Sequence, residues 1–265
     1  MPSAPPAVSV QGVAKVYGGG TLALHGLSFE VDDGALVALL GPSGCGKSTA
    51  LRLIAGLSEP SAGRIIWPGA GAPPGRGGLG VVFQEPTLMP WATAEDNAAL
   101  PLRLMGARRA EARDRARAAL GAVGLAGFER ARPRELSGGM RMRVANARAL
   151  VTEPRVLLLD EPFAALDEIT RFRLNDDLLR LWAAHRLTVL FVTHSVFEAA
   201  FLAGRVLVMT PRPGRVFAEI GVAEPYPRAA GFRASARYAA LCGAISEALR
   251  GAMTAAAGDL RAAAS

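Results

Sequence analysis

One glycine-rich run constrains this chain more than any other feature of its sequence. It fits the pattern G-x-x-x-x-G-K-[ST] and consists of Gly41, Pro42, Ser43, Gly44, Cys45, Gly46, Lys47, Ser48 and Thr49. The apolar run Ala35–Leu40 predicts a buried strand before it, and Lys47–Leu57 predicts a helix after it, a context that disfavours a chance match. Glycines let successive N–H groups point at a polyphosphate, and the helix N-terminus adds partial positive charge. Lys47 can then reach the β- and γ-phosphates of a nucleotide, and the Ser48 hydroxyl can ligate Mg²⁺.

The basic residues of the chain support this interpretation. Lysine and arginine together number 30, yet Lys15 and Lys47 are the only lysines, so a lysine retained inside the loop indicates a specific role. The formal net charge of +7 would suit a nucleic-acid partner. The arginines are scattered, however, and the one dense stretch, Arg108–Arg117, includes Glu111 and Asp114. We therefore expect a solvated helix face there and no nucleic-acid partner.

Cysteine content and hydropathy limit the setting in which the chain works. Cys45 and Cys242 provide neither a disulfide framework nor a metal-binding spacing, which suits a reducing compartment. Cys45 is either a small filler of the loop or a thiol that bound ATP would shield. No apolar run approaches the roughly 18–20 residues that span a bilayer, and Met1–Val10 does not resemble a secretory signal. We expect a soluble protein, or one held at a membrane by a partner.

Hydrophobic periodicity alternates between strand and helix patterns along the chain. Strands are predicted at Val8–Val16, Leu22–Val31, Ala35–Leu40, Gly63–Trp67, Leu79–Phe83, Arg155–Leu159, Thr188–Thr193, Arg205–Met209 and Arg215–Ile220. Helices are predicted within Thr93–Val151 and at Glu168–Ala184, Ser195–Ala203 and Ala234–Arg250. This order predicts an α/β core, residues 8–83 and 154–221, with its ligand at the carboxyl ends of parallel strands. A helical subdomain (84–153) is inserted, and a helical extension (222–265) follows. Residues 1–7 and the loop Gly69–Gly78 are expected to be mobile.

Two adjacent carboxylates follow the apolar strand Arg155–Leu159. Asp160 is placed to hold the shell of a Mg²⁺ ion, and Glu161 can polarise or deprotonate an attacking water. Two carboxylates at a buried strand end are costly for structure and useful for hydrolysis. The alternative is a capping pair before the turn at Pro162.

A third motif, Leu136-Ser137-Gly138-Gly139-Met140, opens a predicted helix between the glycine-rich loop and the carboxylate pair. In this order the motifs resemble those of ABC-transporter ATPases, and the resemblance covers roughly Val8–Ile220. It implies a P-loop NTPase core with an antiparallel β subdomain and an inserted helical subdomain. Four further positions resemble family elements: the adenine-stacking Tyr17, the Q-loop Gln84, the D-loop Ala165-Leu166-Asp167 and the switch His194. Taken singly, Tyr17 would more often be a packed strand residue and His194 a satisfied strand-end histidine.

The resemblance also implies a mechanism that uses ATP and Mg²⁺. Two copies would dimerise head to tail, and each ATP would lie between the phosphate loop of one copy and Ser137 and Gly139 of the other. Ser48, Gln84 and Asp160 would form the Mg²⁺ site. His194 and Glu161 would act at the γ-phosphate and the attacking water, and Asp167 would line the nucleotide interface.

Three segments of the sequence are similar to one branch of the family, the nitrate, sulfonate and taurine importers. The similar segments are Phe83–Trp91, Glu161-Pro162-Phe163 and Pro211–Val216. This similarity implies a transmembrane permease, an extracytoplasmic solute-binding protein acting indirectly, and a place on the cytoplasmic face of the inner membrane. We interpret Met89–Trp91 as the permease-docking surface, with Trp91 as ordinary core the alternative. Four positions depart from the usual pattern: Met142 for Gln, Asn146 for Leu, Ala164 for Gly and Ser195 for Asp.

Two other classes of function are alternatives. The first is a non-transport ABC ATPase that acts in DNA repair, translation or cofactor assembly, and tight, salt-sensitive binding of nucleic acid would favour it. Repair and chromosome types carry long coiled-coil or zinc insertions and translation types carry two cassettes, whereas this chain has no heptads, no cysteine pairs and one cassette. A GTPase would need Asn-Lys-x-Asp, but neither lysine follows an asparagine. A small-molecule kinase would leave Leu136–Met140 without a role.

Overall fold

The computed structural model describes residues 5–68, 74–75, 77–164, 166–229 and 231–262. The chain divides into two compact units. Unit 1 consists of Met1–Pro73 and Thr188–Ser265, and unit 2 consists of Pro74–Leu187. The predicted division into core and helical subdomain follows other boundaries and stays a prediction. Residues 1–4 and much of the Gly69–Gly78 loop lie outside the described residues.

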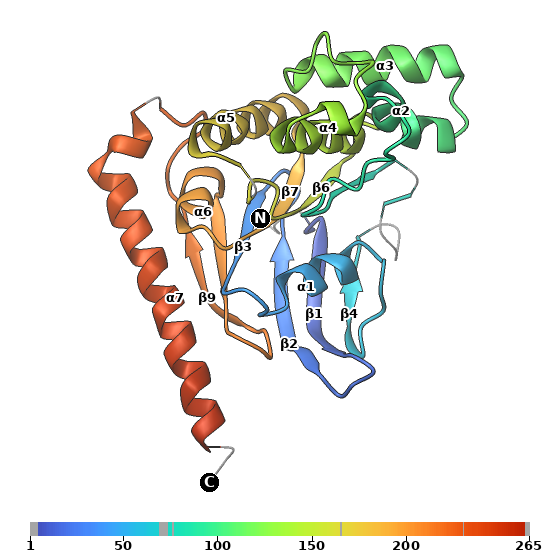
Figure 1. Cartoon of the computed structure of the whole chain (residues 1–265). Coiled ribbons are helices and arrows are strands. Elements are labelled where there is room, and N and C mark those ends of the chain that lie inside the picture. The colour runs from blue at the N-terminus through green and yellow to red at the C-terminus, as the bar shows by residue number, and fades with distance from the viewer. Residues whose placement is uncertain (1–4, 69–73, 76, 165, 230, 263–265) are drawn as a thin grey trace. The chain divides into compact units, whose positions relative to one another are not determined.

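Unit 1 contains an antiparallel sheet in the order β2-β1-β4 (Figure 1). Its strands are β1 (Val8–Val16), β2 (Leu22–Val31) and β4 (Ala62–Ile66). Alternating apolar residues of β1 and β2 give the sheet one buried face, as their sequence period predicts. Predicted and observed bounds agree for β1 and β2.

A second group of strands in unit 1 carries the glycine-rich loop. Strand β3 (Leu36–Leu40) pairs in parallel with β7 (Thr188–Thr193) and β8 (Arg205–Met209), and β9 (Val216–Gly221) is antiparallel to β8. Every residue of β3 and β7 is buried, as continuous apolar runs in parallel sheets predict. Helices α1 (Lys47–Ile54) and α6 (Val196–Leu202) follow β3 and β7 along the chain.

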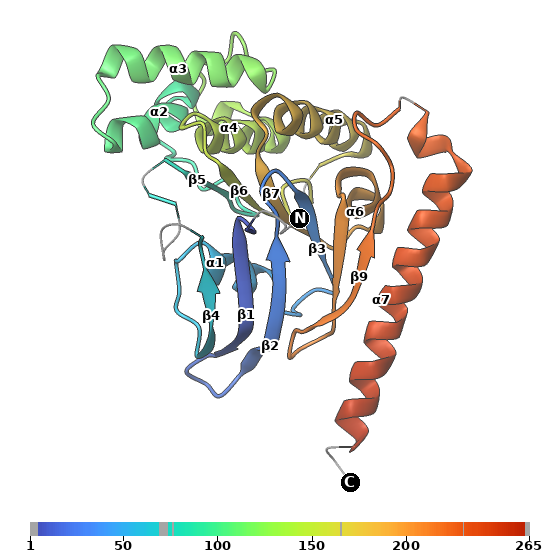
Figure 2. The ribbon, with the colours of Figure 1, turned by 180° about the vertical axis from the view of Figure 1, so that it is seen from behind.

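The C-terminal extension is a short 3-10 turn (Phe232–Ala234) followed by the long helix α7 (Ala236–Ala262). In Figures 1 and 2, α7 runs beside α6 and the strand pair β8–β9, which it contacts. Tyr238, Cys242, Ile245 and Ala252 lie buried along this side at helical spacing. The helix therefore begins later and ends later than the predicted Ala234–Arg250.

Unit 2 combines the parallel strands β5 (Leu79–Val82) and β6 (Val156–Asp160) with helices. Helices α2 (Ala94–Leu104), α3 (Arg109–Ala122) and α4 (Gly138–Leu150) pack around a shared alanine- and leucine-rich core, a 3-10 turn (Pro133–Glu135) precedes α4, and α5 (Glu168–His185) follows β6. Figure 2 shows α2, α3 and α4 side by side. The arginine-dense stretch forms α3. It is not purely a solvated face, because Arg113 and Arg117 both bind the buried Glu95 at 2.9 and 2.8 Å.

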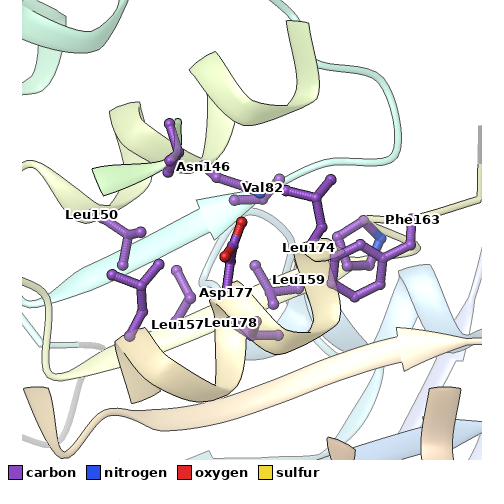
Figure 3. A pocket seen from close by; sticks show the side chains of 12 residues that line it. Val82, Asn146, Leu150, Leu157, Leu159, Phe163, Leu174, Asp177 and Leu178 are labelled. Atoms are coloured by element: carbon purple, nitrogen blue, oxygen red, sulfur yellow. The ribbon is translucent and has the colours of Figure 1, made fainter. Parts of the chain in front are cut away.

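A small cavity of about 20 Å³ lies in unit 2 among side chains of β5, β6, α4 and α5 (Figure 3). Its lining is apolar except for Asn146 and Asp177. The Asn146 Oδ1 atom is buried and has no hydrogen-bond partner among the described residues. Asn146, which departs from the usual leucine of the family pattern, therefore places a polar atom at a helix packing surface. In the described part of the chain, no helix is both long and apolar enough to span a membrane.

Candidate functional site

The glycine-rich loop connects β3 to α1 in a conformation that only glycine tolerates at Gly46. Its φ is +103°, and a Cβ atom there would lie 2.8 Å from Leu24 Cδ2 and 2.9 Å from the Ala23 carbonyl oxygen. Gly44 also has a positive φ, +76°. These two glycines let the chain reverse tightly before α1, where its free N–H groups and helix dipole favour an anion.

Lys47 is buried with its charge inside this loop. Its Nζ atom donates to the carbonyl oxygens of Gly41 at 2.8 Å and Pro42 at 3.0 Å. Because an ammonium group is costly to bury, these two bonds hold it at the position where phosphate oxygens would approach. The Cys45 thiol is buried 3.9 Å from Nζ, as expected of a small filler.

Tyr17 stands beside the loop. It follows β1, its side chain is 42% exposed, and its hydroxyl lies 3.1 Å from Thr49 Oγ1. The alternative that Tyr17 is a packed strand residue is wrong, because its ring is open to solvent. An exposed ring next to a phosphate loop provides a surface on which an adenine can stack.

His194 follows β7 at the edge of the sheet where the loop begins. In the parallel pair of β3 and β7, the last residues of the two strands, Leu40 and Thr193, are opposite each other. Gly41 and His194 are therefore the first residues after two neighbouring strands. The Ser195 N–H donates to Thr193 Oγ1 at 3.0 Å, and the Thr193 hydroxyl donates to the buried Glu198. The turn that carries His194 is thus tied to both β7 and α6.

Unit 2 provides a second group of predicted residues at the carboxyl ends of its own strands. Val82 of β5 is opposite Leu159 of β6, and Gln84 Nε2 donates to Glu161 Oε2 at 3.3 Å. Asp160 is buried at the end of β6. Glu161 has a φ of +46°, a strained conformation for a residue with a side chain. The Glu161 side chain faces Gln84, and the N-cap of the next helix is Asp167 instead of the carboxylate pair.

The Ser-Gly-Gly motif and the D-loop aspartate both lie at helix starts. Ser137 is the N-cap of α4, and its Oγ atom accepts from the Met140 N–H at 3.2 Å. A Cβ atom on Gly139 would lie 3.1 Å from Leu166 Cδ2, a close contact that a small shift of the leucine side chain would relieve. Asp167 caps α5 by accepting from the Thr170 N–H at 2.9 Å, which lowers the pKa of its carboxyl group. Ala165 lies outside the described residues.

Three side chains that sequence reasoning missed brace these loops. Arg148 of α4 donates to the Pro86 and Thr87 carbonyls at 2.9 Å, and burial lowers its pKa. The Arg212 guanidinium donates to the Gly44 carbonyl at 3.1 and 3.2 Å. Asn97 is fully buried and bonds the N–H and the carbonyl of Met89. Of these three residues, only Arg212 had a signal in the sequence, because it lies within Pro211–Val216, a segment similar to the importer branch.

The residues present fit a magnesium nucleotide. In unit 1, the loop has a cradle that a side chain at Gly46 would fill, a buried ammonium group on Lys47 and an oxygen donor in Ser48. In unit 2, β6 ends in the buried carboxylate of Asp160. Mg²⁺ is usually held by one or two carboxylates together with phosphate oxygens and water, so Ser48 and Asp160 are donors of the right kind.

Unit 2 also has a groove, which we call the docking groove and define by its apolar residues Leu79, Val81, Pro101, Leu104 and Met105. It is part of a hollow of about 510 Å³ that Arg148 and Thr152 also line. Leu104 is largely exposed, and Trp91 is 74% exposed, so the alternative that Trp91 is ordinary core is wrong. Asn97 fixes the loop that carries Trp91 through its bonds to Met89, Ala92 and Thr93. Large exposed apolar side chains on a fixed loop are typical of a protein interface.

Comparisons with known proteins agree with this geometry. Residues 24–164 match the family model described as ABC transporter. The chain is 46% identical to a putative ATP-binding protein of Brucella abortus (89% of this chain, 90% of that protein). It is 42% identical to the aliphatic sulfonates import ATP-binding protein SsuB of Bacillus cereus (83% and 88%), and 48% identical to the taurine import ATP-binding protein TauB of Rhizobium johnstonii (76% and 77%).

Solved structures give the same result. A dimeric post-hydrolysis state of the ATP-binding cassette MJ0796, bound to ADP and phosphate, is similar with a TM-score of 0.75 and 32% identity, covering 81% of this chain and 98% of that one. A second dimeric structure of MJ0796 has a TM-score of 0.73 and 31% identity, with the same coverage.

Proposed function

Because the chain belongs to the ABC transporter family and is an ABC ATPase, we propose that it is the ATP-hydrolysing subunit of an importer. The observation that carries this proposal is that the phosphate loop, the Gln84–Glu161 pair and His194 are all present, in a chain 42–48% identical to import subunits. The ATP-binding part of the prediction agrees with the family match, and importer function is the step that we propose.

In the proposed mechanism, the loop N–H groups and Lys47 bind the β- and γ-phosphates. Ser48, Asp160 and Gln84 would hold Mg²⁺, which when bound would supply positive charge to the phosphoryl group. Glu161 takes a proton from the attacking water. His194 contacts the γ-phosphate. Tyr17 stacks on the adenine.

We propose that a second copy of the chain completes the site. Ser137 and Gly139 lie at the first turn of α4, where free N–H groups would meet the γ-phosphate of the partner copy's nucleotide. Asp167 would line the same interface. The dimeric state of the MJ0796 cassettes, one of them with ADP and phosphate, supports this arrangement.

The docking groove and Trp91 support a permease as the partner on the cytoplasmic face of the inner membrane. A cytoplasmic helix of a permease with apolar side chains is the occupant that fits exposed Leu104 and Trp91. The relatives named for aliphatic sulfonate and taurine import support a small sulfonate-like or taurine-like organic compound as the solute. A solute-binding protein would act through the permease.

Substitution Glu161→Gln tests the proposed chemistry. It removes the base and keeps the shape, so we expect kcat to fall by about 10²–10⁴-fold. With Mg-ATP the variant should elute as a dimer in size-exclusion chromatography with light scattering. The matched control is Glu153→Gln, because Glu153 also has a positive φ, +54°, and lies outside the proposed site. A Glu161→Gln protein that hydrolyses ATP at the wild-type rate would refute the assignment.

A further inference from the structure

The segment that follows β9 closes over the C-terminal end of α6. The guanidinium of Arg228 donates to the Phe201 carbonyl at 2.9 Å and the Ala203 carbonyl at 2.7 Å, and it also bonds the Glu224 carbonyl. The Tyr226 hydroxyl donates to the carbonyl between them, that of Leu202. Two side chains thus bind three consecutive carbonyls at a helix end, where no intrahelical N–H is available.

Aromatic packing fixes the two donors. The Arg228 guanidinium lies 3.9 Å from the centre of the Tyr226 ring and 5.5 Å from that of Phe232. Burial raises the pKa of Tyr226 to about 12 and lowers the pKa of Arg228, although both groups keep their ordinary protonation at neutral pH. A stacked, half-buried guanidinium loses little freedom on binding, because its planar fork is already oriented.

The same extension also binds the first turn of α6. The Tyr238 hydroxyl of α7 donates to the Phe197 carbonyl at 2.9 Å, and the Tyr238 ring packs edge-on against Phe232. The Arg233 guanidinium lies 3.4 Å from the centre of the Phe201 ring. Helix α6 is therefore bound by the extension at both of its ends.

His194 immediately precedes this helix. Ser195 is the N-cap of α6, and the turn around His194 is bonded to Glu198 of α6 through Thr193 and Ser195. A short helix moves as a rigid body, so a shift of α6 along its axis would move His194 by a similar distance. Reacting groups misplaced by about 1 Å can cost on the order of 10²-fold in rate.

We infer that the C-terminal extension is a clamp on α6, and that Arg228 is a positioning residue for His194. This inference rests on the proposed function, in which His194 contacts the γ-phosphate. Arg228 touches neither nucleotide nor water in this account. It acts through α6 alone, so its effect should fall on catalysis and leave ATP binding by the phosphate loop unchanged.

The kinetic test compares full-length wild type, Arg228→Ala, His194→Ala and the double variant. We expect Arg228→Ala to lower kcat about 10- to 100-fold while the Kd for a fluorescent ATP analogue stays within about twofold. The double variant should hydrolyse ATP no more slowly than His194→Ala alone, because both substitutions disrupt the same interaction, that of His194 with the γ-phosphate. Arg250→Ala, which removes an exposed arginine from the same extension, is the control. A multiplicative loss in the double variant, or an unchanged kcat in Arg228→Ala, would overturn the inference.

A spectroscopic test does not depend on activity. The chain has three histidines, His25, His185 and His194, so isotope labelling gives three assignable imidazole signals. Arg228→Ala should shift the His194 signal and leave the other two in place. If Arg228→Ala does not fold, Tyr226→Phe is the milder substitution, and it should shift the His194 signal in the same direction. An unmoved His194 signal contradicts the clamp. A shifted signal in a protein without ATP hydrolysis would retain the clamp and refute the proposed function.

Discussion

Lys47 shows most directly how one residue type is fixed by its surroundings. Arginine is the usual basic residue of this chain, yet the group that bonds Gly41 and Pro42 at 2.8 and 3.0 Å is an ammonium. A compact point charge fits among carbonyls within a tight turn, whereas a planar guanidinium is larger and presents its donors in a fixed fork. Composition and geometry therefore assign the same role to Lys47.

We predict that both Lys47→Ala and Lys47→Arg weaken ATP binding by about 10- to 100-fold, the equivalent of one lost hydrogen bond to a charged group. Titration with a fluorescent ATP analogue measures this. Arg250→Lys is the control, because it makes the reverse exchange at an exposed arginine of α7 that has no part in the proposed nucleotide site. Equal affinity in wild type and Lys47→Arg would show that any cation suffices.

The Asp167 cap gives a pH-dependent prediction. Hydrogen bonding to the Thr170 N–H lowers the pKa of Asp167 in the folded chain below its ordinary value of 3.8. A depressed folded pKa contributes stability that is full above the ordinary value and is lost as the pH falls through the folded value. We expect Asp167→Ala to lower Tm at pH 7 and to differ progressively less from wild type below pH 3.8.

Asp167→Asn is the control for this cap, because asparagine also caps helices and does not titrate. Its Tm difference from Asp167→Ala should stay constant across the same pH range. A wild-type advantage over Asp167→Ala that persists undiminished at pH 2 would show that the ionised carboxylate is not the stabilising form.

Local motifs predict the candidate site residues, whereas contacts between distant positions leave no local pattern in the sequence. Lys47, Gln84, Glu161 and His194 follow buried strands, a pattern visible in a few residues of sequence. Arg148 bonds Thr87 across 61 positions and Arg212 bonds Gly44 across 168, and no local pattern marks such pairs among many arginines.

At the scale of elements, α4 contains an unfavourable residue. Asn146 stands at the cavity shown in Figure 3 with a buried Oδ1 atom that no described residue satisfies. An unsatisfied buried polar group costs about 1–3 kcal/mol. Leucine has the same branched arrangement of side-chain heavy atoms as asparagine, and the adjacent cavity can take part of its larger volume. We predict that Asn146→Leu raises the free energy of unfolding by about this amount, measured by denaturant titration.

Asn97 is the matched control, because it is buried in α2 of the same unit with its amide fully engaged. Asn97→Leu should destabilise the protein by leaving the Met89 N–H unsatisfied. If Asn146→Leu is instead no more stable than wild type, the Asn146 amide is satisfied by water in solution.

Element type was predictable for every strand, while element ends were less so. The identity of most strands follows from continuous or alternating apolar runs that become buried, whereas β4 is exposed or half-buried along its whole length. Helix α7 shows the limit, because the chain continues helical through Gly251 to Ala262 in an alanine-rich stretch. The predicted helix ends at Arg250, directly before Gly251. In the structure Gly251 packs against the Phe217 ring, where a Cβ atom would lie 3.2 Å from a ring carbon, and the helix continues past it.

At the scale of the whole molecule, the proposed function couples ATP hydrolysis to transport through a partner permease. The sequence could predict the order of motifs, because each lies in a short segment. It left open whether Trp91 is exposed or part of the core, and it did not indicate that Asn97 fixes the loop of Trp91, because both depend on the packing of α2. In the proposed function, the exposed Trp91 and the docking groove are the features that favour a transport subunit over an isolated ATPase.

The most direct measurement of this claim is affinity purification from native membranes with tagged Glu161→Gln protein and Mg-ATP, with partners identified by mass spectrometry. Trp91→Ala with Leu104→Ser, introduced into the same background, is the comparison, since neither residue belongs to the nucleotide site. We predict that a multi-span permease is recovered with Glu161→Gln and is lost from the comparison protein. Recovery of nucleic acid or soluble proteins alone would contradict the importer function.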